Sequence, residues 1–203
     1  MTQRKRIVVL LSGRGSNMCA LLESTRSADF PGEIVAVLSD RGDAGGLETA
    51  RAAGIHAEAV PRKGHPDKAS HEAAMIAAIE AAKPDVICLA GYMRLLSADF
   101  VDRFAGRMIN IHPSLLPLFP GLETHRRAIE AGVKLHGCTV HFVTFVMDGG
   151  PIIAQAAVPV EPRDTPETLA ARVLVAEHAL YPKALAMVLR GDVAMDGERA
   201  VFA

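Results

Sequence analysis

Short apolar runs that suit buried strands alternate with alanine-rich stretches that suit helices along the first hundred residues. The predicted strands cover Ile7–Leu11, Ile34–Leu38 and Pro84–Gly91, and the predicted helices cover Gly45–Ala53 and Lys68–Ala82. Runs that are apolar throughout are typical of strands buried on both faces, and repeated strand–helix units build parallel sheets with right-handed crossovers. The first half of the chain therefore predicts a doubly wound α/β fold.

The pattern changes after His125, where apolar and polar residues begin to alternate. Residues 138–145 alternate as one strand, Asp148–Pro151 form a turn, and residues 152–160 return as a second strand. This arrangement predicts a hairpin-like antiparallel extension of the sheet.

A long helix is predicted near the C-terminus. It begins after Thr165, which is a good N-cap, continues through Pro166 at the first turn, and ends near Arg190 because Gly191 follows. We therefore expect an α/β protein built as one Rossmann-like domain over residues 1–203. Its doubly wound, mostly parallel sheet carries the C-terminal antiparallel extension and the long C-terminal helix.

The composition of the chain limits the number of domains, the partners and the compartment that we expect. The 203 residues, half of them hydrophobic, suit one compact domain, and 22 basic against 23 acidic residues leave a formal charge of -1. Such a balance gives no overall attraction for nucleic acid or an anionic membrane, so we expect small-molecule partners. Three scattered cysteines suit a reducing compartment. The first apolar run has five residues, too short for a signal or a membrane span, and predicts a cytoplasmic protein.

A strand, a glycine-containing loop and a helix follow one another at Ser12–Asn17. Backbone amides at a helix N-terminus bind anions, so Gly15, Ser16 and Asn17 could hold a single terminal phosphate. The alternative is a tight turn in which Ser16 or Asn17 merely caps the helix. A dinucleotide site would need a glycine where Met18 stands, although Asp40 imitates the acidic residue of such sites.

The residues Arg107–Pro117 contain the candidate catalytic pair. Because side chains alternate along a strand, Asn110 and His112 share one face, and Pro113 places them at the strand's carboxyl end. An amide and an imidazole about 3 Å from a carbonyl oxygen would stabilise an oxyanion, and the Asp148 carboxylate could hold the imidazole. This set suits acyl transfer. The plain alternative is that these residues only stabilise turns or the core.

No enzyme nucleophile accompanies this set in a recognisable pattern, since Ser114 follows a proline and there is no G-x-S-x-G sequence. Attack would then come from the substrate. His136 and His141 are not spaced as metal ligands, so no metal site is expected. Cys88, within an apolar strand, is expected to be an inert core residue.

Taken together, these motifs resemble the phosphoribosylglycinamide formyltransferase family of folate-dependent purine-biosynthesis enzymes. The motifs run in order from residue 6 to about residue 190, and are Ser12–Asn17, Leu89–Arg94, Asn110–Pro117, Pro120–Gly121, Thr124–His125 and Asp148–Pro151. The resemblance implies transfer of the formyl group of 10-formyltetrahydrofolate, the cosubstrate, to the amine of 5'-phosphoribosylglycinamide. The resemblance also implies that Asn110, His112 and Asp148 are the catalytic residues.

The resemblance also implies binding residues. Gly15, Ser16, Asn17 and Glu177 would hold the ribonucleotide. The folate residues would be Lys68, Met93, Arg94, Leu95, Leu96, Asn110, Thr144, Phe145, Val146, Met147 and Asp148. Lys68 would meet the glutamate tail, with Arg94 a second candidate. An N-terminal phosphate-binding part would cover about residues 1–105, and a folate-binding and catalytic part about residues 106–203.

Two positions depart from the family pattern. Phe145 and Val146 stand where members usually carry an acidic residue, and Glu123 stands where many carry histidine. Other enzymes that use 10-formyltetrahydrofolate, of the deformylase or tRNA formyltransferase type, are alternatives, as is a non-catalytic nucleotide-binding α/β module. For the assembly we expect a monomer or a weak homodimer.

Overall fold

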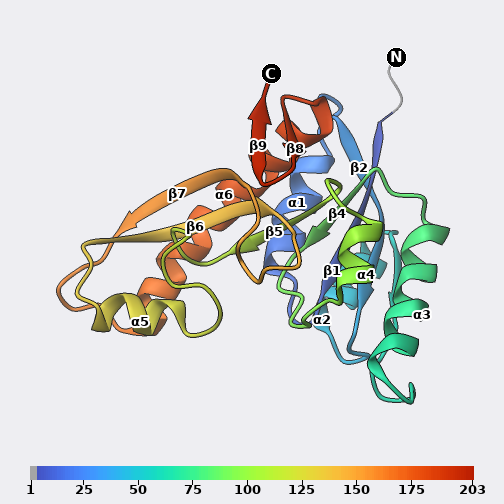
Figure 1. The fold of residues 1–203 in the computed structure, drawn as a ribbon, viewed down its shortest axis with the longest axis horizontal. Coiled ribbons are helices and arrows are strands. Elements are labelled where there is room, and N and C mark those ends of the chain that lie inside the picture. Colours follow the sequence, from blue (N-terminus) through green and yellow to red (C-terminus); the bar gives the residue numbers. More distant parts are fainter. Residues whose placement is uncertain (1–3) are drawn as a thin grey trace. The chain divides into compact units, whose positions relative to one another are not determined.

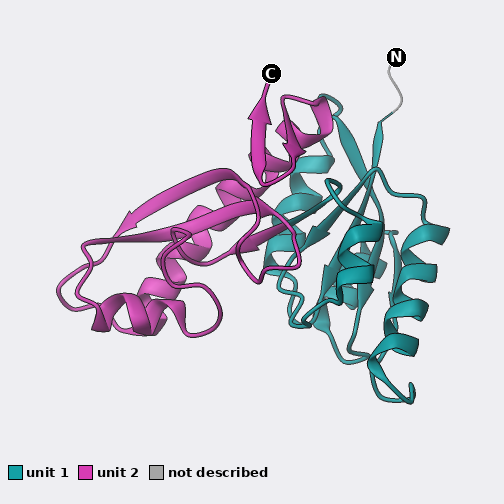
Figure 2. Ribbon diagram, in the orientation of Figure 1, with its two compact units in different colours: residues 1–109 teal, residues 110–203 magenta. Residues whose placement is uncertain are grey.

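The computed structural model describes residues 4–203 (Figure 1). Met1–Gln3 lie outside the described residues. The chain forms two compact units, residues 1–109 and residues 110–203 (Figure 2). No helix within residues 4–203 is both long and apolar enough to cross a membrane.

Unit 1 consists of strands followed by helices. Its strands are β1 (Lys5–Leu11), β2 (Gly32–Ser39), β3 (His56–Ala59) and β4 (Val86–Leu89), and its helices are α1 (Ser16–Thr25), α2 (Gly45–Ala52), α3 (Lys68–Ala81) and α4 (Ala98–Arg103). The strand β1 pairs in parallel with both β2 and β4, and β2 pairs in parallel with β3. Every residue from Ile7 to Leu11 is fully buried, as the continuous apolar run predicts for a central strand.

Unit 2 contains the antiparallel part. Its elements are α5 (Thr124–Glu130), β6 (Leu135–Phe142), β7 (Ile152–Pro159), α6 (Pro166–Arg190), β8 (Val193–Asp196) and β9 (Arg199–Phe202), and β5 (Met108–His112) spans the boundary between the units. The strands β6 and β7 pair antiparallel, as do β8 and β9. One seven-stranded sheet has the order β3-β2-β1-β4-β5-β6-β7.

The long helix α6 begins and ends where the sequence predicts. Thr165 forms a capping box with Thr168, since each side chain bonds the other's backbone N–H, and Pro166 occupies the first turn. Gly191 ends the helix in the left-handed conformation. The predicted α/β class, the mostly parallel sheet, the antiparallel extension and the C-terminal helix are all confirmed.

Several boundaries and elements differ from the prediction. The strand expected over residues 138–145 lies at Leu135–Phe142, because residues 144–147 form the loop that leads to the Asp148 turn. Five short elements were not predicted from the sequence, namely β3, α4, α5, β8 and β9.

Candidate active site

The strand β5 carries the candidate pair at its carboxyl end. Ile109 and Ile111 are buried in the core, while Asn110 is half-buried and His112 is 6% exposed at the last position of the strand. The alternation of side chains therefore separates an apolar face from a polar one, as the sequence predicts.

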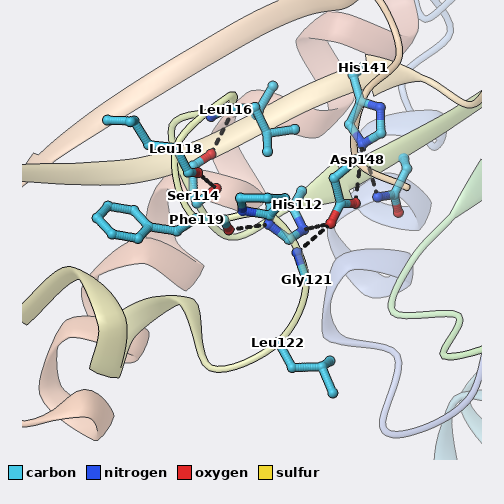
Figure 3. Close-up of polar contacts among 12 residues, drawn as sticks. His112, Ser114, Leu116, Leu118, Phe119, Gly121, Leu122, His141 and Asp148 are labelled. Atoms are coloured by element: carbon cyan, nitrogen blue, oxygen red, sulfur yellow. Dashed lines mark hydrogen bonds and ion pairs between the residues drawn. The ribbon is translucent and has the colours of Figure 1, made fainter. Parts of the chain in front are cut away.

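His112 has a polar neighbour at each ring nitrogen (Figure 3). Its Nε2 is 3.1 Å from the carbonyl oxygen of Phe119, within hydrogen-bond distance, and its Nδ1 is 3.4 Å from Oδ2 of Asp148, close enough for an ion pair. The Phe119 carbonyl and the Asp148 carboxylate thus hold the ring from two sides.

Asp148 is held by the turn that links β6 to β7. Its backbone has a φ of 53°, the left-handed conformation, and its Oδ2 accepts a 2.7 Å hydrogen bond from the Gly121 N–H. Gly150 makes this turn possible, because a Cβ atom there would lie 1.8 Å from the carbonyl oxygen of Phe142. The turn and the backbone bond together fix the carboxylate beside His112.

His141 belongs to the same cluster, which the sequence did not reveal. Its Nδ1 is 2.9 Å from the Phe142 carbonyl oxygen and its Nε2 is 3.2 Å from Nδ2 of Asn110. Burial lowers the pKa of His141, although Asp148 and the Phe142 carbonyl oppose the shift. A neutral ring that donates from Nδ1 leaves Nε2 as the acceptor for Asn110, so His141 orients that amide. Oδ1 of Asp148 is 3.9 Å from the same Nε2.

Nearby nucleophilic side chains are not activated. The Ser114 hydroxyl is fully buried and donates a 2.7 Å bond to the Leu118 carbonyl. The Cys138 thiol is buried, which raises its pKa to about 12. Neither group has the neighbouring base or the lowered pKa that covalent catalysis needs.

The loop Ser12–Asn17 in unit 1 has the geometry of an anion site. Gly15 precedes α1 with a φ of 76°, and a Cβ atom there would lie 3.0 Å from the Cα of Gly46, so only glycine suits this position. No side chain caps α1 within the described structure, so Ser16 does not act as the plain cap considered above but is the first residue of the helix. Asn17 is 92% buried in the first turn.

The predicted folate residues fall in loops of both units. Met93 and Leu95 are 70% and 68% exposed in a segment of unit 1 that has no regular secondary structure. Phe145, Val146 and Met147 are similarly exposed in the loop of unit 2 that precedes Asp148. Thr144 lies in the same loop, and Leu96 is half-buried. Large apolar side chains left in contact with water are often recognition surfaces.

Charged residues expected to contact substrates have partners in the structure. Nζ of Lys68 is 3.6 Å from Glu72, and the Arg94 guanidinium is 2.6 Å from Asp40. Both basic residues pair with a buried carboxylate, and the contact of Arg94 is the shorter of the two. Glu177 is buried on α6 in unit 2, and its assignment to the ribonucleotide stays a prediction. No group of three or more metal-binding side chains occurs within residues 4–203.

The fold and this cluster define a formyl transferase. Residues 5–185 match the family model described as Formyl transferase, so the chain belongs to that family. Among its relatives, phosphoribosylglycinamide formyltransferase of Escherichia coli (strain K12) is 44% identical over 200 residues, 95% of this chain and 94% of that protein. The resemblance seen in the sequence is thereby confirmed.

Solved structures agree with this assignment. Glycinamide ribonucleotide transformylase 1 from Symbiobacterium toebii superposes with a TM-score of 0.95 at 46% identity, over 100% of this chain and 95% of that one. Phosphoribosylglycinamide formyltransferase from Brucella melitensis is 57% identical, with a TM-score of 0.89 over 99% of this chain and 100% of that one.

Proposed function

We propose that this protein transfers the formyl group of 10-formyltetrahydrofolate to the amine of 5'-phosphoribosylglycinamide, giving the N-formyl ribonucleotide and tetrahydrofolate. Family membership and the names of the relatives support this reaction. The observation that carries it is the cluster of Asn110, His112 and Asp148, in which Nδ1 of His112 is 3.4 Å from Asp148 and no activated enzyme nucleophile takes part.

The reaction is an acyl transfer in which one substrate attacks the other. The amine nitrogen of the ribonucleotide forms a bond to the formyl carbon, and the electron pair of the C=O bond moves onto oxygen. The Asn110 amide and the protonated His112 ring donate to this oxyanion. When the oxyanion collapses, the bond from the formyl carbon to N10 of the folate breaks and N10 takes up a proton.

Asp148 has two roles in this scheme. Its carboxylate holds His112 through Nδ1 and stabilises the imidazolium. It also helps to relay protons through water: it accepts the proton that the attacking amine loses and passes it back to His112, which donates a proton to N10. His141 keeps the Asn110 amide turned so that one N–H bonds the ring and the other is left for the oxyanion.

The two substrates are held by separate segments. The backbone amides and side chains of Gly15–Asn17 bind the ribosyl phosphate, supported by the uncapped start of α1, and Glu177 contacts the rest of the ribonucleotide. Met93–Leu96 and Thr144–Asp148 bind the pterin of the folate, and Lys68 binds its glutamate tail. We further propose a monomer or weak homodimer in the cytoplasm, with a phosphate-binding part and a folate-binding part in one domain.

A kinetic comparison tests this function. Purified protein is assayed with both substrates, beside His112→Ala and a control, His56→Ala, whose imidazole is exposed in unit 1. We expect His112→Ala to lower kcat by about 10³-fold or more, with ribonucleotide affinity retained, because it removes both an oxyanion donor and the proton donor. An active His112→Ala protein, or a wild-type protein that formylates free amino acids or tRNA instead, would contradict the proposal.

A further inference from the structure

In the sequence, Asp40 stands where a dinucleotide-binding site would carry its ribose-binding carboxylate. In the structure, the Asp40 carboxylate instead bonds the side chains of Ser12 and Arg94. Asp40 directly follows β2 and is 4% exposed. Its Oδ1 accepts a 2.5 Å hydrogen bond from the Ser12 hydroxyl, and its Oδ2 accepts a 2.6 Å bond from Nε of Arg94. Because the carboxylate is buried and already bonded to two side chains, it is not presented to a ribose.

Ser12 connects the Asp40 carboxylate to the backbone of the segment Gly91–Met93. While its hydroxyl donates to Asp40, its oxygen accepts a 2.9 Å bond from the Met93 N–H, and its own N–H donates to the Gly91 carbonyl at 3.0 Å. The segment that begins at Gly91 is thus attached to Ser12 by two hydrogen bonds and to Asp40 by the Arg94 ion pair.

The segment Gly91–Leu96 depends on such attachments because it forms neither helix nor strand. At its far end, the Ser97 N–H donates a 3.0 Å bond to Oε1 of Glu72, a carboxylate that is itself buried. Two buried carboxylates therefore fix the ends of a segment whose Met93 and Leu95 side chains are turned to solvent. Holding a loop in its binding conformation lowers the entropy that a ligand must remove.

We propose that Asp40 is a positioning residue for folate: through Ser12 and Arg94 it fixes the backbone of Met93–Leu95 in the conformation that receives the pterin. This inference rests on the proposed function, since it concerns the same folate segment. Asp40 contacts no substrate. Its effect on the ribonucleotide is small, because the Ser12 hydroxyl keeps an acceptor when the carboxylate becomes an amide.

The first test is Asp40→Asn in the full chain, with Asp43→Asn as the matched control. Asp43 also forms an ion pair with an arginine, Arg41, but both side chains are largely exposed. Calorimetry gives the Kd of tetrahydrofolate and of phosphoribosylglycinamide, and steady-state assays give kcat and KM. We expect Asp40→Asn to raise the folate Kd and KM about tenfold or more, since the half-exposed Arg94 loses its charged partner and with it the contact that holds the segment.

The ribonucleotide Kd and the kcat at saturation should change by less than about threefold in Asp40→Asn, and all constants by less than about twofold in Asp43→Asn. A purely structural role would instead lower the melting temperature and the active fraction and leave the ratio of the two Kd values unchanged. If Asp40→Asn does not fold, Ser12→Ala serves as the second variant, because it removes the bond to the Met93 N–H and should also weaken folate selectively.

A double-mutant cycle with Arg94→Gln completes the test. If Asp40 acts through Arg94, the double variant should bind folate about as weakly as either single variant. An unchanged folate Kd, an equal loss for both ligands, or additive effects would overturn the inference while the proposed function stands. A wild-type protein that neither binds folate nor transfers formyl would overturn the proposed function and this inference with it.

Discussion

The β6–β7 turn places the Asp148 carboxylate beside three residues, namely His112, Gly121 and His141. We predict that Asp148→Asn lowers kcat by about 10²–10⁴-fold, because an amide neither balances the imidazolium nor accepts a proton. The KM values should change far less, since the carboxylate acts mainly in the transition state. Steady-state kinetics measures this, with Asp102→Asn on α4 as an exposed control. Unchanged turnover would remove Asp148 from the mechanism.

His136 supplies a prediction about stability in acid. The residue is 1% exposed, and its ring packs edge-on against His125 and Phe119. Burial, mainly, lowers its pKa to about 4. Between about pH 6.5 and 4 the unfolded chain therefore binds a proton that the folded chain does not, so stability is present above this window and is lost as the pH falls through it.

The effect of His136 is at most about 3.5 kcal/mol across that window, at about 1.4 kcal/mol for each pH unit. Urea unfolding of the wild-type protein and of His136→Asn from pH 8 to pH 5 measures it, and the variant should show a smaller loss in acid. His56→Ala, at an exposed position, should keep the wild-type slope. Equal slopes for wild type and His136→Asn would show that His136 is not the group responsible.

How far single residues could be predicted depended on whether their partners lie on the same strand. Asn110 and His112 could be placed on one face because alternation within a strand is a local property. The link from His141 to Asn110 could not, because it joins side chains 31 positions apart and needs the arrangement of the strands. The available signal was a histidine at the last position but one of β6.

At the scale of elements, the β6–β7 turn determines where Asp148 stands. We predict that Gly150→Ala destabilises the protein and lowers kcat, because its Cβ atom would collide with the Phe142 carbonyl at 1.8 Å and displace the turn. Gly42→Ala, where the new atom meets nothing within 4 Å, is the control. Thermal unfolding and turnover are the two measurements, and a Gly150→Ala protein with wild-type values for both would contradict the geometry of the turn.

Elements with strong local signals were predicted, and short, half-exposed ones were not. Continuous apolar runs identified β1, β2 and β4, and caps with a terminal glycine identified α6. The strand β3 reads His-Ala-Glu-Ala, with no apolar run, and its burial alternates between exposed and half-buried. The helix α4 did carry a readable signal, since the Ser97 hydroxyl accepts a bond from the Phe100 N–H as an N-cap.

At the scale of the whole molecule, the chain supports an acyl transfer between two bound substrates. Its proposed phosphate loop lies in unit 1, its candidate catalytic cluster lies in unit 2, and its family is that of the formyl transferases. The fold class followed from sequence pattern because strand–helix alternation admits few topologies. The identity of the substrates did not follow from pattern, since folds carry many functions; it came from the ordered motifs.

The most direct measurement follows the formyl carbon itself. Wild-type protein is incubated with 10-formyltetrahydrofolate labelled with ¹³C in the formyl group, together with 5'-phosphoribosylglycinamide, and the products are resolved by NMR. We predict that the label appears in the formamide of the ribonucleotide, in amounts equal to the tetrahydrofolate formed. Label recovered as free formate whether or not the ribonucleotide is present would contradict this account, because the site would then be passing the formyl group to water.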